Sequence, residues 1–178
     1  ALKLAANYKL VADIDFADLN LDGTTDAQEL IDFNADKTLV DWNGSGGVDA
    51  ADDKGFNPIG TFTGSFDGAD HTIKNLYIDS TANNNAMFLR TDGASISNIV
   101  IDSADITGGY YTGALIGEVV NNDTVVENVT VSNSTVSSVA HSNVGGVVGQ
   151  NKSGTLTLTD VTVSNSTITS GSNNVGGL

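Results

Sequence analysis

The sequence predicts an all-β fold of the parallel β-solenoid type, in which strand-bearing coils stack into a column. A repeat is the first reason: VTVSNSTV, beginning at Val129, returns as VTVSNSTI at Val161. The second is the alternation of apolar and polar side chains within this repeat, which is typical of strands with one buried face. A third is that NVGGVVGQN at Asn143 returns as NVGGL at Asn174. One coil cannot bury its apolar face alone, so the repeats are expected to stack.

The elements are expected in the following order. YKLVADIDF, beginning at Tyr8, alternates well and predicts a first strand. Residues 17–55 then break the pattern with Asp, Asn and Gly, and they contain one helix-like stretch, DAQELIDFNADKTLV. From Phe56 the strand pattern resumes and continues to the end of the sequence. We therefore expect a single solenoid domain over residues 1–178 that carries a small helical insertion at 17–55.

Two earlier and looser copies of the repeat are expected at LYIDS, from Leu76, and IVIDSADI, from Ile99. In this alignment one Asn or Asp precedes a strand in each coil and forms a ladder at a tight corner: Asn75, Asn98, Asn128 and Asp160. Strand parity then directs alternate apolar residues inward: Leu76/Ile78, Ile99/Ile101, Val129/Val131 and Val161/Val163. Thr130, Ser132, Thr162 and Ser164 are expected to face water. A further corner or close backbone approach is expected at Gly113, Gly145/Gly146 and Gly176/Gly177.

Composition narrows the class of protein. The formal charge is −15, from 22 acidic and 7 basic residues, so the surface repels nucleic acid and anionic membranes and attracts cations. The chain has no cysteine, hence neither disulfides nor thiolate metal sites. No apolar run is long enough to span a membrane. The last motif stops earlier than its previous copy, which leads us to expect a fragment of a longer repeat protein.

The first part of the insertion fits the twelve-residue calcium loop D-x-[DN]-x-[DN]-G-x5-E at every defined position. Its ligand positions are Asp18, Asn20, Asp22, Thr24, Asp26 and Glu29. Oxygens at alternate positions converge on the cation, Gly23 makes the sharp turn, and Glu29 would close the site with both carboxylate oxygens. The sequence therefore predicts a Ca2+ site that staples the insertion. The alternative is a turn that is simply rich in Asp, Asn and Gly.

A second loop is weaker. Its positions are Asp41, Asn43, Ser45, Gly47, Asp49 and Asp52. Ser45 replaces the third acidic or amide ligand, and Asp52 replaces the closing Glu, whose longer side chain binds more readily through both oxygens. Whether this loop binds a second Ca2+ is left open.

Several of these segments together resemble a known family. FTGSFDGADHTIKNL, from Phe62 to Leu76, with NPIG ahead of it, looks like the opening block of bacterial surface proteins with GLUG repeats. NVGGVVGQN and TGALIGEV look like the GLUG repeat itself. The resemblance implies a right-handed parallel β-helix in a secreted or surface-anchored, adhesin-like bacterial protein. The paired loops resemble those of EF-hands and dockerin modules, which are not part of the common GLUG pattern.

Enzymatic activity is not expected. A lyase of acidic polysaccharides needs a strong base beside a bound cation, but Arg90 and six lysines are scattered along the sequence. A polygalacturonase-type site needs several close Asp with a His and a basic residue, and the repeats contain no such group. A zinc peptidase needs a His-Glu-x-x-His helix, and neither His71 nor His141 lies in one.

The predicted function is a calcium-stabilised, non-catalytic solenoid module of a secreted or cell-surface adhesin-like protein, with carbohydrate or another surface protein as possible partners. One alternative is a subunit of an extracellular filament, because an uncapped solenoid end exposes strand edges that can pair end to end with another copy. Another is a carbohydrate- or ice-binding face formed by stacked Thr and Ser, suggested by the run from Thr155 to Ser170.

Overall fold

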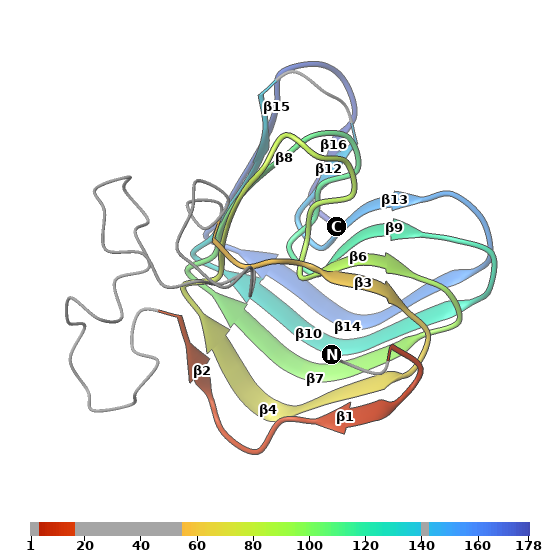
Figure 1. Ribbon diagram of the computed structural model, residues 1–178. Coiled ribbons are helices and arrows are strands. Elements are labelled where there is room, and N and C mark those ends of the chain that lie inside the picture. The colour runs from red at the N-terminus through yellow and green to blue at the C-terminus, as the bar shows by residue number, and fades with distance from the viewer. Residues whose placement is uncertain (1–3, 17–54, 140–142) are drawn as a thin grey trace, which may run out of the picture.

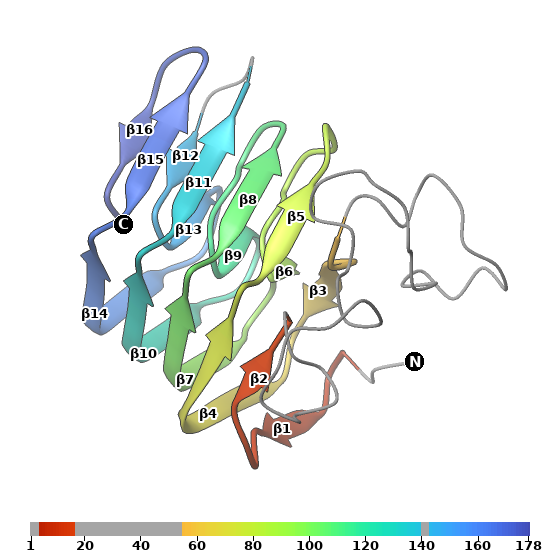
Figure 2. The same cartoon turned by 90° about the vertical axis from the view of Figure 1, so that its left-hand side faces the viewer.

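The chain winds into a parallel β-solenoid. The computed structural model describes residues 4–16, 55–139 and 143–178, and every regular element in these ranges is a strand (Figure 1). The strands of successive coils lie side by side, with the first coil at one end of the column and the last at the other (Figure 2). Seen as in Figure 1, the chain runs clockwise while it recedes from the viewer, which is the sense of a right-handed coil.

Three main parallel sheets form the walls of the column. Sheet A contains β1 (Asn7–Lys9), β2 (Ile14–Asp15), β4 (Ser65–Lys74), β7 (Ser95–Asp102), β10 (Thr124–Ser132) and β14 (Leu156–Ser164). Sheet B contains β5 (Tyr77–Asp79), β8 (Asp105–Gly108), β11 (Thr135–Ser138) and β15 (Thr167–Ser170). Sheet C contains β3 (Ile59–Phe62), β6 (Phe88–Thr91), β9 (Ile116–Val119) and β13 (Val148–Asn151). A short pair, β12 (Val144–Gly145) and β16 (Val175–Gly176), completes the last coils.

The core is built from rungs of like side chains, because the register places equivalent residues of successive coils next to one another. One rung in sheet B joins Ile78, Ile106, Val136 and Ile168, and one in sheet A joins Ile73, Ile101, Val131 and Val163. The rung members in the inner coils are fully buried. The inward direction predicted by strand parity is thus confirmed, and Val161 and Val163 are only half-buried because they lie in the last coil.

Corners between the sheets require backbone with positive φ. In the described part of the chain, nine of the fourteen non-glycine residues with positive φ are asparagines, which tolerate the left-handed region because their short polar side chain can bond locally. The predicted ladder of Asn98, Asn128 and Asp160 is one such corner, with φ between 51° and 54°. The predicted close approach of the backbone at glycine is also confirmed at Gly113 and Gly145, where a Cβ would overlap a carbonyl oxygen.

The alignment of the first coil predicted from the sequence is wrong. Ile99 and Ile101 pair with His71 and Ile73 in sheet A, whereas Ile78 pairs with Ile106 in sheet B. Asn75 therefore belongs to a different corner from Asn98. Its equivalents are Ser103, Asn133 and Asn165, which have positive φ and, like Asn75, follow directly on a strand of sheet A.

The single first strand expected from the sequence is also wrong, because the structure has two strands there. YKLVADIDF forms two short strands, β1 and β2, which pair with the two halves of β4 on either side of its bulge. The expected helical insertion lies almost entirely outside the described residues. Its last residue, Gly55, bridges Ile78 on the edge strand of sheet B.

Candidate functional site

The twelve predicted calcium-binding positions all lie in the range 17–54, outside the described residues. They are Asp18, Asn20, Asp22, Thr24, Asp26, Glu29, Asp41, Asn43, Ser45, Gly47, Asp49 and Asp52. Within residues 4–16, 55–139 and 143–178, no three His, Asp or Glu side chains gather closely enough to hold a metal ion. The calcium sites therefore remain predictions from the sequence.

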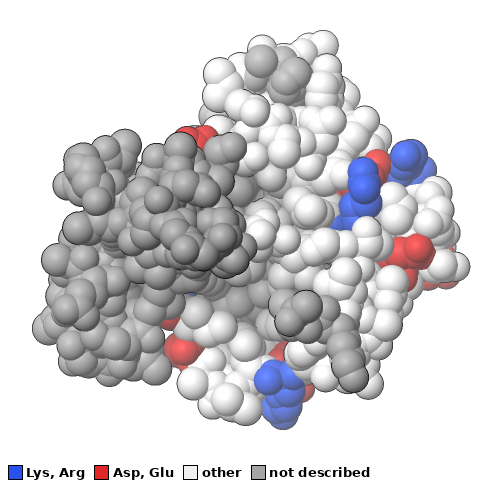
Figure 3. All heavy atoms as spheres, in the orientation of Figure 1, with Lys and Arg blue, Asp and Glu red and all other residues white. Residues whose placement is uncertain are grey.

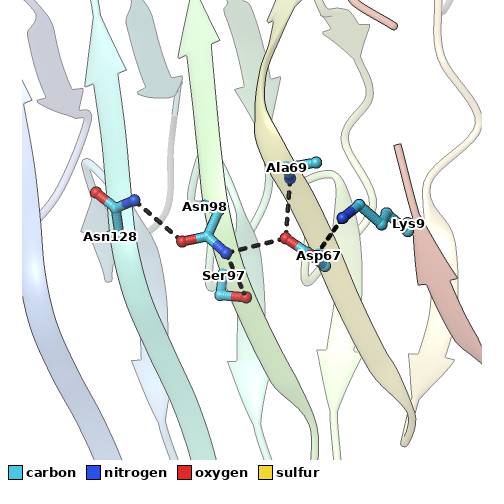
Figure 4. A network of polar contacts seen from close by, with 6 residues as sticks. All are labelled: Lys9, Asp67, Ala69, Ser97, Asn98 and Asn128. Atoms are coloured by element: carbon cyan, nitrogen blue, oxygen red, sulfur yellow. Dashed lines mark hydrogen bonds and ion pairs between the residues drawn. The ribbon is translucent and has the colours of Figure 1, made fainter. Parts of the chain in front are cut away.

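Acidic side chains at the corners connect one coil to the next. Figure 4 shows one example, in which Asn98 Nδ2 in β7 donates to Asp67 Oδ1 in β4 at 2.9 Å, and Asn128 Nδ2 in β10 donates to Asn98 Oδ1 at 3.0 Å. The backbone N–H of Ala69 also donates to Asp67, and Lys9 Nζ lies 3.5 Å from its other oxygen. The hydrogen bonds from Asn98 and Ala69 lower the pKa of Asp67, because they stabilise the ionised carboxylate.

The same arrangement recurs at other corners. Asp102 accepts hydrogen bonds from Ser132 Oγ and Asn133 Nδ2 of the following coil, each at 2.7 Å. Asp92 accepts from the side-chain amides of Asn121 and Asn122. These contacts lower the pKa of both carboxyl groups. Each of these carboxylates is therefore a coil-to-coil cross-link in its ionised form.

The N-terminal coil is attached in the same way. Asp13 accepts from the backbone N–H of Thr72 at 2.9 Å and contacts His71 Nδ1 at 3.1 Å, and these contacts lower its pKa. Asp15 accepts from Asn75 Nδ2 at 2.7 Å. His71 thus has a structural partner at the corner.

A charged ladder crosses sheet C, and the sequence did not reveal it. The Glu118 side chain is only 3% exposed, and its Oε2 accepts from Arg90 Nε at 2.8 Å. Lys152 Nζ lies 3.7 Å from its Oε1. The three residues come from successive coils, so the charges alternate as plus, minus, plus along the column. The available signal was that Arg90 and Glu118 both hold the third position of a four-residue segment, FLRT and IGEV, in the two copies.

The outward-facing side chains of sheet B form two flat ranks. Register places Asp79, Thr107, Ser137 and Thr169 in one rank, and Tyr77, Asp105, Thr135 and Thr167 in the other. Thr107 Oγ1 and Ser137 Oγ lie 3.0 Å apart. Burial and the nearby Asp79 carboxylate raise the pKa of Asp105. In the second rank, Thr135 and Thr167 lie next to each other in the last two coils, and the equivalent residue of the coil before them is Asp105.

An apolar cavity of about 420 Å³ lies at the N-terminal end of the column. Its wall includes Tyr8, Phe16, Phe56, Phe62 and Phe88. Phe16 and Phe56 lie close to the two ends of the range 17–54 in sequence. Nothing in the described residues shows what fills this space.

Charged side chains are sparse on the face shown in Figure 3, where uncharged residues form most of the described surface. The described ranges contain no helix that is long and apolar enough to cross a membrane.

Comparison with known proteins gives one informative match. The chain is 35% identical over 127 residues, or 66% of its length, to halomucin from Haloquadratum walsbyi. The chain spans about 1% of the length of that relative. No family profile matches the chain, and no solved structure matches it significantly. Because Haloquadratum walsbyi is an archaeon, this match gives no support to the bacterial origin that the GLUG resemblance implied. The chain is thus a parallel β-solenoid that is similar in sequence to part of halomucin.

Proposed function

We propose that the chain is a non-catalytic β-solenoid module of a secreted or cell-surface protein, where it acts as a spacer and a display surface. The observation that carries this proposal is the continuous column of coils, which are cross-linked by hydrogen bonds and carry mainly Ser, Thr and Asp on the outer face of sheet B. The similarity to a protein named halomucin supports an extracellular setting, since mucins as a class are secreted or surface proteins. We further propose an adhesin-like role, in which the stack of coils holds a binding surface away from an anchor.

The location can be tested on intact cells of the source organism. Antibodies raised against the column should label the cell surface or the medium, and external protease should remove the label. Label confined to the cytoplasm of lysed cells would contradict the proposal.

The absence of catalysis is part of the proposal. The buried carboxylate of Glu118 has a cation on each oxygen, and the Asp carboxylates at the corners accept coil-to-coil hydrogen bonds. Groups held in this way are poor general bases. Release of unsaturated or reducing ends from acidic polysaccharides by the pure chain would overturn this part.

Calcium is proposed as the staple of the insertion. Ten of the 22 acidic residues lie in the range 17–54, and this range also carries the complete loop motif from Asp18 to Glu29. Oxygen ligands at this density suit Ca2+. We expect chelation to lower the melting temperature of the wild type and to leave a Glu29→Gln variant nearly unchanged. Equal melting curves of the wild type with and without chelator would refute the stapling role.

The second loop has its own reporter. Trp42 directly follows Asp41, so Tb3+ bound in this loop should show luminescence sensitised by the indole. The Asp41→Ala variant should lose the signal, whereas Asp18→Ala should keep it. A signal that survives Asp41→Ala would place the lanthanide elsewhere.

A filament subunit is the second candidate. The edge strands β14 and β15 have no further strand beyond them in the described residues, and Val161, Val163 and Ile168 are half-buried at this end. Such an edge can accept another coil, either from the same chain or from a second copy. Light scattering over a range of concentrations distinguishes the two, since a strictly monomeric particle excludes the filament.

A Thr/Ser face for carbohydrate or ice is the third candidate. Thr157, Thr159, Thr162, Thr167 and Thr169 lie on the last two strands, and only Thr130 and Thr135 continue these ranks in the coil below. Thermal hysteresis of a solution of the chain tests the ice-binding version. A freezing point equal to the melting point would exclude it.

A further inference from the structure

One corner residue departs from the rule that the other coils follow. In all four coils, one residue between the strand of sheet B and the next strand, in the segment that we call the tip, has positive φ at an equivalent position. Three of these residues are asparagines, Asn84, Asn143 and Asn174, with φ from 62° to 66°. The fourth, in the coil of β8, is Tyr111 with φ 61°. The bridge between Thr112 and Val144 and the bond from Gly113 N to Asn85 O show that these positions are equivalent.

Tyrosine is a poor choice for this backbone. The left-handed region brings Cβ close to the following carbonyl oxygen, and asparagine tolerates this better than other side chains because it bonds locally. Tyr111 has a bulky side chain without that compensation. Its hydroxyl forms no hydrogen bond with any residue of the described ranges. A strained residue of this kind is a reason to look for a function.

What Tyr111 gains is an aromatic neighbour on the surface. Its ring lies 5.8 Å from the ring of Tyr110, at an interplanar angle of 47°. Tyr110 is 41% exposed and Tyr111 is half-exposed. Two of the four tyrosines of the chain therefore form one exposed ring pair, whereas most other aromatic rings line the core.

The ring pair is held rigidly by the tip below it. Gly108 and Gly109, which precede the tyrosines, have no room for a Cβ, because it would press on Thr112 and on the backbone of Ala82. Tyr110 N donates to Asn83 Oδ1 at 3.1 Å, and Asn84 N donates to Tyr110 O at 2.7 Å. The exposed side-chain amide of Asn83 is thus held at the backbone of Tyr110.

We propose that Tyr110, Tyr111 and Asn83 form a binding site for a neutral glycan. The proposal rests on the proposed display function and names the ligand of one displayed surface. Tyrosine rings offer a rigid, amphipathic contact surface at a low entropic cost, and a neighbouring amide can bond to sugar hydroxyls. The net charge of −15 disfavours an anionic glycan. A protein partner would need about 800 Å² of surface on each side, and the rest of the tips consists mainly of Ser, Thr, Asn and Gly.

The test is affinity electrophoresis of the whole chain in gels that contain dextran, mannan or galactan, with alginate as the anionic control. We expect at least one neutral polysaccharide to retard the wild type, and Tyr110→Ala and Tyr111→Asn to weaken binding by about tenfold or more. Val125→Ala, which also truncates an exposed side chain but lies on β10 in sheet A, is the matched control and should bind normally.

A second readout separates a functional residue from a structural one. Tyr111→Asn restores the residue that the other coils use, so it should raise the melting temperature by about 2–4 °C while it weakens binding. Normal binding by Tyr111→Asn, a fall in its melting temperature, retardation by alginate alone, or capture of a protein but of no glycan would overturn the site. None of these results bears on the surface location, which is tested on intact cells.

Discussion

Single residues at the corners determine how firmly the coils are held together. The core rungs contribute burial, but hydrocarbon contacts alone do not fix the rotation of one coil over the next. Asp67, Asp92 and Asp102 each accept hydrogen bonds from the following coil. Glu118 accepts a hydrogen bond from Arg90 of the preceding coil and forms an ion pair with Lys152 of the following coil. These directional contacts specify the register, whereas the sequence pattern alone indicates only that coils stack.

The buried carboxylate of Glu118 gives a residue-scale prediction. Arg90→Ala should destabilise the fold by about 2–3 kcal/mol, because it leaves a buried negative charge with only the more distant Lys152. The double variant Arg90→Ala with Glu118→Gln should recover part of this loss, since no charge is then stranded. Urea denaturation of the four members of this cycle measures the coupling. Additive effects would show that the pair does not interact.

The corner aspartates give a prediction about pH. The pKa values of Asp13, Asp67, Asp92 and Asp102 lie below the ordinary value of 3.8, so each prefers to be ionised in the folded chain. Their contribution is therefore complete above the unfolded pKa and is lost as the pH falls through the lower folded pKa. Asp105, whose pKa is raised, acts in the opposite direction.

The experiment compares melting temperatures of the wild type and the Asp92→Asn/Asp102→Asn variant as the pH is lowered from neutral to acid. The wild type should lose more stability on acidification than the variant does, because the variant lacks two of the groups that titrate. Parallel curves for the two proteins would show that these carboxylates are not cross-links.

At the scale of elements, the alternating strands explain most of what the sequence predicted correctly. Valine and isoleucine at alternate positions favour strands, and the repeat forced these strands to pair in parallel. The first coil was misaligned for a physical reason. Sheets A and B share one sequence pattern, in which a corner Asn precedes an apolar residue, a variable residue, a second apolar residue and an Asp. NIVID in sheet A and NLYID in sheet B both fit this pattern. The corner within β4 has three residues, Gly68 to Asp70, whereas the equivalent corner within β7 is Asn98 alone. Because of these extra residues, the number of residues between motifs in the first coil does not show which motif belongs to which sheet.

The alternation of inward and outward side chains along the strands predicts that substitutions on the two faces reduce the free energy of unfolding by different amounts. Ile106→Ala, in the fully buried rung of sheet B, should cost about 2–5 kcal/mol because it leaves a cavity between two neighbouring coils. Thr130→Ala, on the outer face of sheet A, should change the stability by less than about 0.5 kcal/mol. Chemical denaturation checks both. Similar costs at the two positions would be incompatible with the inward and outward assignment.

The candidate site was less predictable than the fold. The calcium loops are a motif of fixed spacing, so the sequence alone could propose them, but they lie outside the described residues. The ladder of Arg90, Glu118 and Lys152 and the contact between Asn83 and Tyr110 depend on which coils lie next to one another. The adjacency of coils follows from the strand register, and this register could be determined only from the structure.

For the whole molecule the dominant feature is charge. A formal charge of −15 on 178 residues makes the folded chain repel itself, and salt screens this repulsion. We expect the melting temperature to rise between about 0.05 M and about 1 M NaCl, over which the screening length falls several-fold. A matched series in which acidic residues of the range 17–54 are replaced by Asn should show a smaller rise. A melting temperature that falls with salt would contradict this account.

The stacking of parallel coils in register is tested most directly by cysteine cross-linking, since the chain has no cysteine of its own. Thr130 and Thr162 are directly paired on the outer face of β10 and β14. The Thr130→Cys/Thr162→Cys variant should therefore form an intramolecular disulfide under mild oxidation, whereas Thr130→Cys/Thr157→Cys should not. Efficient cross-linking of the second pair, or failure of the first in a folded protein, would contradict the solenoid.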